Sequence, residues 1–181
     1  MNRQGTWMQT VSGKAFWPID PRPEELDIGD IAHALSMMCR YGGHCSRFYS
    51  VAEHSVLMAS YALANHGEEV AKIALMHDAT EAYLTDVIRP IKAHLSNYKE
   101  IEGRLWLCVA ERFGLPRVIP DEVQHLDNAI LRDEMSALHM PPPMDWNIPS
   151  EGLGVHIAGW EPSLARWAFL GMYYRLWGET C

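Results

Sequence analysis

Four ionisable side chains lie close together in one short, otherwise apolar stretch of the sequence, residues 74–86. They are the adjacent pair His77-Asp78, then Glu81, then Asp86. Burying several charged groups is unfavourable unless a metal ion or a partner compensates them. On a helix, residues three or four apart share one face, so His77, Asp78 and Glu81 can point into one cleft. The plainer alternative is a His-Asp pair that only bonds to the backbone at a helix end.

Two residues elsewhere in the chain could complete a metal site. His54 falls in the first turn of an expected helix, and Asp127 falls in an apolar part of another. Together with His77 and Asp78 they supply two imidazoles and two carboxylates, a set that suits Mn, Fe, Co or Zn better than Ca. Such a site, with room left for water, can activate a nucleophile. Asp133 is an alternative last ligand, less favoured because its surroundings are less apolar.

Cationic side chains near this stretch could hold a phosphorylated ligand. Arg40 and Lys92 are the leading candidates, and Arg89, Arg47 and His44 are weaker ones. Arg40 has a competing role, because a basic side chain at a helix end can bind the last carbonyls of its own helix.

The elements that position these residues are expected to be helices. Apolar periodicity predicts them over about residues 24–40, 50–67, 68–83, 97–113, 120–139 and 162–178. Ser50 and Glu53 form a capping-box pattern, in which Ser50 caps the helix and Glu53 reaches back to it. Residues 1–23 are expected to hold a hairpin around Ser12-Gly13 and a Pro-rich extended segment, and residues 140–161 a long loop. The prediction is one all-α domain, residues 1–181, built as an orthogonal helical bundle with a small N-terminal β-hairpin.

Composition narrows the class of protein. The 181 residues are 48% hydrophobic and 21% charged, which is typical of a globular chain. A net charge of −8 disfavours a general nucleic-acid surface, which would need a basic face. We expect no membrane span and no leader peptide, and therefore a cytoplasmic protein. The cysteines show no disulfide or metal spacing, so we expect reduced thiols at Cys39, Cys45, Cys108 and Cys181.

The order His54, His77-Asp78, Asp127 resembles the HD-domain metal-dependent phosphohydrolases, an all-helical superfamily named for its adjacent His-Asp ligands. Three strings are similar to a narrower branch: Cys39-Arg-Tyr-Gly-Gly, Tyr49-Ser-Val-Ala-Glu-His-Ser, and His77-Asp-Ala-Thr-Glu-Ala-Tyr-Leu-Thr-Asp with Pro90-Ile-Lys after it. That branch contains the bacterial 5'-deoxynucleotidases and the phage dATP triphosphohydrolases, which deplete dATP in viruses whose DNA carries 2-aminoadenine. The resemblance covers residues 24–139 and is most specific over residues 49–92.

The resemblance implies a role for each matched residue. The metal ligands would be His54, His77, Asp78 and Asp127, holding Co, Mn, Zn or Fe, with a second ion such as Mg accompanying the phosphates. Glu81 would orient or deprotonate the attacking water, and Asp86 would be a second active-site carboxylate near the scissile phosphate. Arg40 and Lys92 would bind phosphate. Tyr41 would lie beside the base or sugar, and Pro90 would form part of the wall against the base.

These roles imply hydrolysis of a purine deoxynucleotide. The leading expectation is a dATP triphosphohydrolase, which converts dATP and water to deoxyadenosine and triphosphate. A 5'-deoxynucleotidase acting on dNMPs, an HD phosphodiesterase and an inactive nucleotide-binding HD module are the alternatives. Relatives form dimers or hexamers, so the resemblance also implies a homo-oligomer, in the host cytoplasm if a phage encodes the chain. The sequence alone leaves the base preference, the number of phosphates and the native metal open.

Overall fold

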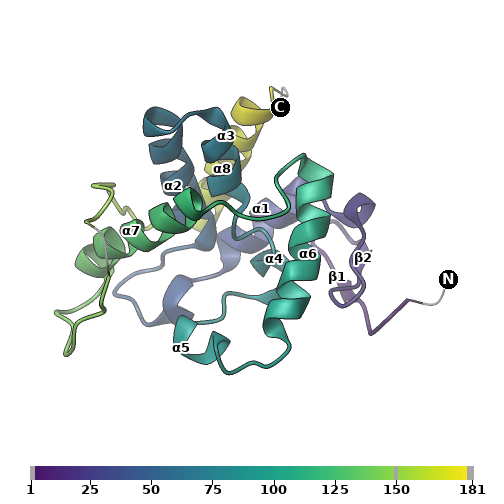
Figure 1. The fold of residues 1–181 in the computed structure, drawn as a ribbon, viewed down its shortest axis with the longest axis horizontal. Coiled ribbons are helices and arrows are strands. Elements are labelled where there is room, and N and C mark those ends of the chain that lie inside the picture. The colour runs from purple at the N-terminus through teal and green to yellow at the C-terminus, as the bar shows by residue number, and fades with distance from the viewer. Residues whose placement is uncertain (1–2, 149–150, 179–181) are drawn as a thin grey trace.

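The computed structural model describes residues 3–148 and 151–178 of the chain. Within them the chain is mostly helical with a small N-terminal hairpin, which confirms the expected all-α class (Figure 1). The strands are β1 (Met8–Gln9) and β2 (Ala15–Phe16). The longer helices are α1 (Ile28–Met37), α2 (Val51–Asn65), α3 (Glu68–Met76), α6 (Tyr98–Phe113), α7 (Asp121–Leu138) and α8 (Pro162–Trp177). The shorter ones are α4 (Glu81–Leu84), α5 (Arg89–Lys92) and two 3₁₀ helices, η1 (Pro23–Glu25) and η2 (Arg40–Gly43).

Helix α2 belongs to the main hydrophobic core. It packs against α3 and α8, and α1 packs against both α2 and α8 (Figure 1). Side chains with no exposed surface come from all four helices, among them Ile31, Leu35, Met58, Leu75 and Phe169. Burying one such side chain stabilises the fold by ~1.5–3 kcal/mol. The first turn of α2, which carries His54, is therefore part of a firmly packed element.

Helix α1 is shorter at both ends than the sequence predicted. Asp27 Oδ1 accepts hydrogen bonds from the amides of Gly29 (2.9 Å) and Asp30 (3.2 Å), and this cap starts the helix at Ile28. Beyond Met37 the chain becomes extended, and the Arg40 amide donates to the Tyr49 carbonyl at 2.9 Å. This pairing holds the segment after α1 beside the segment that leads into α2.

The helix predicted over residues 68–83 is interrupted. Helix α3 ends at Met76, and two bonds of 3₁₀ type follow, from the Ala79 amide to the Met76 carbonyl and from the Glu81 amide to the Asp78 carbonyl, both at 2.9 Å. Helix α4 begins only at Glu81. His77 and Glu81 therefore do not share the face of one continuous helix, and the expected spacing argument is corrected. The His77-Asp78 pair lies in a tighter turn.

The N-terminal hairpin is smaller than expected but is anchored in the core. Its antiparallel register pairs Met8 with Phe16, and Gly13 supplies the positive φ (83°) that the turn needs. Phe16 is fully buried and stacks on Tyr83 of α4, with the ring centroids 4.0 Å apart. The hairpin thus packs against the element that follows the His-Asp turn.

Only half of the predicted capping box forms. The Ser50 hydroxyl accepts a hydrogen bond from the Glu53 amide at 3.0 Å, as expected. The Glu53 carboxylate, however, does not reach back to Ser50. It accepts bonds from the amides of Ala158 (3.0 Å), Gly159 (2.9 Å) and Trp160 (2.6 Å). The fully buried Glu53 side chain therefore ties the segment before α8 to the first turn of α2.

The structure tests two further expectations in part: reduced cysteines and the absence of a membrane span. Of the cysteines, Cys39, Cys45 and Cys108 are free thiols, and Cys181 lies outside the described residues. No helix in residues 3–148 or 151–178 combines the length and apolarity that crossing a bilayer requires.

We expect Glu53→Ala to lower the free energy of unfolding by about 1–3 kcal/mol, because three amides lose their shared charged acceptor. Urea denaturation of the purified protein measures this loss. Glu69→Ala is the matched control, since the Glu69 side chain is 85% exposed and should matter by less than about 0.5 kcal/mol. Equal unfolding midpoints for the two variants would contradict the anchoring role of Glu53.

Candidate metal and phosphate site

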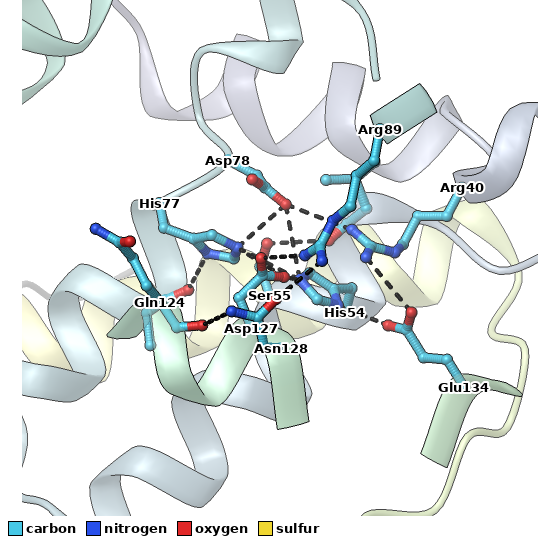
Figure 2. A network of polar contacts seen from close by, with 12 residues as sticks. Arg40, His54, Ser55, His77, Asp78, Arg89, Gln124, Asp127, Asn128 and Glu134 are labelled. Atoms are coloured by element: carbon cyan, nitrogen blue, oxygen red, sulfur yellow. Dashed lines mark hydrogen bonds and ion pairs between the residues drawn. The ribbon is translucent and has the colours of Figure 1, made fainter. Parts of the chain in front are cut away.

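The four side chains expected to bind metal converge on one point. His54 comes from α2, His77 and Asp78 from the turn after α3, and Asp127 from α7 (Figure 2). Donor atoms of His54, His77 and Asp127 lie within 4.8 Å of one another. Asp78 Oδ2 is 3.2 Å from His77 Nε2 and 3.7 Å from His54 Nε2, and Asp127 Oδ1 is 3.3 Å from His54 Nε2. Four donors from three elements therefore surround one small space.

Both imidazoles are oriented by hydrogen bonds at the opposite ring nitrogen. His54 Nδ1 lies 2.7 Å from Glu134 Oε1, and His77 Nδ1 lies 2.8 Å from the carbonyl oxygen of Ala74. A carbonyl accepts only, as does an ionised carboxylate, so each Nδ1 carries the proton and each Nε2 presents a lone pair when the ring is neutral. The two Nε2 atoms are 3.4 Å apart. Two facing lone pairs repel unless a cation or a proton lies between them.

The electrostatics of this cluster favour positive charge at its centre. Burial lowers the pKa of His77, but Asp78 and Asp127 outweigh that effect and hold the pKa well above its ordinary value. Burial raises the pKa of Asp78, yet the charge on His77 brings it down to about 2. The pKa of Asp127 likewise lies well below its usual range, because hydrogen bonds with His54 and His77 overcome the effect of burial. Both carboxylates are therefore ionised.

Glu134 is a buried residue of the site that sequence reasoning missed. Its side chain has no exposed surface, and besides His54 it accepts hydrogen bonds from the hydroxyls of Tyr49 (2.9 Å) and Tyr41. Arg40 lies on its other side, with Nη2 3.4 Å from Oε2. Burial raises the pKa of Glu134, but Arg40 and His54 outweigh it and lower the pKa to about 2. Its position seven residues after Asp127, on the same face of α7, was the signal available in the sequence.

Glu81 and Asp86 border the metal ligands. Glu81 is only 6% exposed, and its Oε2 atom is buried with no hydrogen-bond partner among the described residues. Burial, followed by the charges of Asp78 and Asp86, raises the pKa of Glu81 well above its usual value. Burial also raises the pKa of Asp86, although Arg40 opposes it. This unpartnered buried carboxylate oxygen is available to take or give a proton.

Three cations surround the carboxylates. Arg40 is buried and lies 3.5 Å from Asp78, so it faces the site rather than the carbonyls of α1. Lys92 Nζ is 2.6 Å from Glu102 Oε1. Arg89 was a weaker candidate in the sequence, yet its guanidinium donates to Asp127 Oδ2 at 2.8 Å (Figure 2). It reaches Asn128 Oδ1 at the same distance, and Asn128 was not foreseen.

A cavity of about 510 Å³ opens above the ligands. Nine of the residues named from the sequence line it: Arg40, Tyr41, Asp78, Glu81, Asp86, Arg89, Pro90, Lys92 and Asp127. His54 is buried and His77 is partly buried, and neither is among the residues that line the cavity. Leu131, Trp146, Asn147 and Ile148 also line the cavity and were not predicted; Trp146 to Ile148 belong to the loop after α7.

Three weaker candidates lie outside this wall. Asp133 accepts bonds from the amides of Leu153 (2.7 Å) and Gly154 (3.2 Å), whereas Asp127 lies beside His54. Arg47 binds the carbonyl oxygen of Ile157 at 3.0 Å, and His44 is exposed at the end of η2. Neither lines the cavity within the described part of the chain.

Two bacterial proteins are similar to this chain, whereas no protein-family model matches it. One is the Uncharacterized protein YfdR of Escherichia coli (strain K12), 38% identical over 143 residues that cover 79% of this chain and 78% of YfdR. The other is the Uncharacterized protein RCAP_rcc00048 of Rhodobacter capsulatus, 41% identical over 124 residues that cover 65% of this chain and 63% of the relative. The identity and the coverage shared with YfdR place the chain in the YfdR family.

Proposed function

We propose that this chain is a metal-dependent phosphohydrolase of purine deoxynucleotides. One observation carries the proposal: His54 and His77 are both held with Nδ1 as the donor, so that two Nε2 lone pairs 3.4 Å apart face the same point. Two carboxylates, from Asp78 and Asp127, border that point as well. Such a set of two imidazoles and two carboxylates suits a divalent cation that would keep positions for water and substrate.

The donor set fits a transition metal. His54, His77, Asp78 and Asp127 would hold Mn, Fe, Co or Zn, because imidazole and carboxylate donors together suit these ions. When bound, such an ion supplies a water of lowered pKa and polarises a phosphate oxygen. The two converging Nε2 atoms and the ionised carboxylate of Asp127 beside them are the features of the chain that support this fit.

The remaining residues would serve hydrolysis at the phosphorus bonded to the nucleoside 5'-oxygen. Glu81 would take a proton from the attacking water through its unpartnered Oε2 and return it to the leaving 5'-oxygen. A new P–O bond forms to the water oxygen as the bond to the 5'-oxygen breaks. Arg40 and Lys92 would stabilise charge on the phosphate oxygens, and Asp86 would border the scissile phosphate. No covalent nucleophile is needed.

The charge balance of the cavity separates the two leading substrates. Among the described residues, three cations (Arg40, Arg89, Lys92) and four carboxylates (Asp78, Glu81, Asp86, Asp127) line it. One divalent ion therefore turns a formal excess of one negative charge into an excess of one positive charge. A monophosphate carries about two negative charges and a triphosphate roughly twice as many. A dNMP, the second candidate substrate, therefore fits this charge balance without a further ion. The first candidate, dATP, would enter with a Mg ion on its phosphates.

Variants of the ligands and of Glu81 test the proposed activity. His77→Ala should lose bound Co or Mn together with turnover of dATP and dAMP, measured by elemental analysis and product chromatography. Glu81→Gln should keep the metal and lose about 10²–10⁴-fold in rate, as for removal of a general base. His125→Ala is the control, because this exposed histidine lies two positions before Asp127 on the same helix. Full turnover in His77→Ala would refute the site.

Glu134 should act on the metal through His54. We expect Glu134→Gln to weaken Co binding by about 10–100-fold, because the charged partner that fixes the His54 ring is lost. Calorimetric titration of metal into the protein measures this directly. Glu122→Gln is the matched control on α7, since the Glu122 side chain is 50% exposed and pairs with His66 instead. Equal metal affinity in both variants would show that Glu134 has no orienting role.

The two substrates should differ in their need for a second ion. Protein stripped of metal and reloaded with one equivalent of Co or Mn should hydrolyse dAMP without added Mg. Release of triphosphate from dATP should require Mg in addition, because the cavity holds too little positive charge for an uncomplexed triphosphate. Chromatography of the products with and without Mg measures both reactions. Equal dATP turnover in the two conditions would show that the charge argument is wrong.

A further inference from the structure

The loop that follows α7 folds back over the cavity. Trp146, Asn147 and Ile148 from this loop line its wall, together with Ile88 and Pro90 from the segment around α5. Arg132 of α7 donates a hydrogen bond to the carbonyl oxygen of Ile148 at 2.8 Å, and the Asn147 amide donates to Asp145 Oδ1 at 2.9 Å. The loop is therefore attached to the helix that carries Asp127 and Glu134.

Trp146 belongs to a cluster of three aromatic rings. Its ring centroid lies 4.9 Å from that of His139 and 5.9 Å from that of Tyr41, and the Tyr41 and His139 rings meet edge to face at 4.6 Å. These separations are typical of favourable aromatic pairs. Trp146 is nevertheless 36% exposed, so the cluster does not enclose it. Part of a large flat ring is left open to the cavity and solvent.

Tyr41 fixes the position of this cluster relative to the metal ligands. Its hydroxyl donates to Glu134, the residue that also bonds His54 Nδ1. Its backbone adopts a φ of 59°, a conformation that bulky residues rarely adopt and that the surrounding contacts must hold in place. The Tyr41 ring therefore links Trp146 to Glu134 and, through Glu134, to His54.

We propose that Trp146 is a substrate-binding residue that stacks on the nucleobase and makes the cavity selective for a base-bearing phosphate. The proposal rests on the proposed function for the position of the phosphate. The exposed Trp146 ring supplies one flat apolar surface, and Pro90, Ile88 and Leu131 supply apolar surface elsewhere in the same cavity. A purine, the larger of the two base types, gains most from such stacking, because stacking grows with the shared ring area.

Binding of two ligands that differ only in the base tests this role. dAMP and deoxyribose 5-phosphate share the phosphate and sugar, so the ratio of their dissociation constants isolates the base. We would titrate both into metal-loaded protein by calorimetry, in a Glu81→Gln background that suppresses turnover. Trp146→Ala should weaken dAMP binding by about 10–100-fold, as for loss of one base–aromatic stack, and leave deoxyribose 5-phosphate unchanged. Trp146→Phe should retain most of the preference for dAMP.

Trp167→Ala is the matched control, since this tryptophan of α8 is 69% exposed and does not line the cavity. Equal weakening of both ligands in Trp146→Ala would overturn the proposal, because it would mean that Trp146 only supports Tyr41. Unchanged binding of both ligands would overturn it as well. Hydrolysis of dAMP by the protein with an intact Glu81 is assayed separately. If the protein hydrolyses dAMP but its base preference does not depend on Trp146, the stacking role alone is refuted. If it hydrolyses dAMP with none of the metals, the proposed function is refuted.

Discussion

The site depends on the contacts made by the buried carboxylate of Glu134. It has no exposed surface, so its charge must be balanced within the protein, and His54, Tyr41, Tyr49 and Arg40 all converge on it. Leaving a buried charge without partners is strongly unfavourable, whereas a fully partnered one fixes the geometry around it. Glu134 therefore joins α7 to α2 and to the segment that precedes α2, both of which lie at least 80 residues earlier in the chain (Figure 2).

Helix α7 then sets several features of the site at once. Asp127 and Glu134 lie two helical turns apart on one face, so any shift of α7 would move both Asp127 and the partner of His54 together. The same helix holds the loop with Trp146 through Arg132 and holds residues 153–154 through Asp133. Leu126 and Ile130 anchor α7 in the core, and they therefore fix the positions of Asp127, Glu134 and the cavity wall relative to one another.

Much of this fold and site could be predicted from local sequence, and the remainder depended on contacts between distant segments. Ser50, Gly114 and Pro162 mark helix ends correctly because capping and backbone restriction act within a few residues. The convergence of His54, His77, Asp78 and Asp127 was expected from their donor chemistry together with the family resemblance of the strings around them. The roles of Glu53 and Glu134 could not be predicted, because each resembles an ordinary helix glutamate until its partners from distant segments are known.

The break after α3 shows why the adjacent His-Asp pair needs a departure from regular helix. Neighbouring residues on an α-helix do not face each other, yet His77 Nε2 and Asp78 Oδ2 lie 3.2 Å apart. The 3₁₀-type bonds that follow Met76 tighten the backbone at this point, and His77 still reaches back to the Ala74 carbonyl with Nδ1. A continuous helix through residue 83, as apolar periodicity indicated, would separate the two donors. The interruption is therefore what lets two consecutive side chains point toward one another.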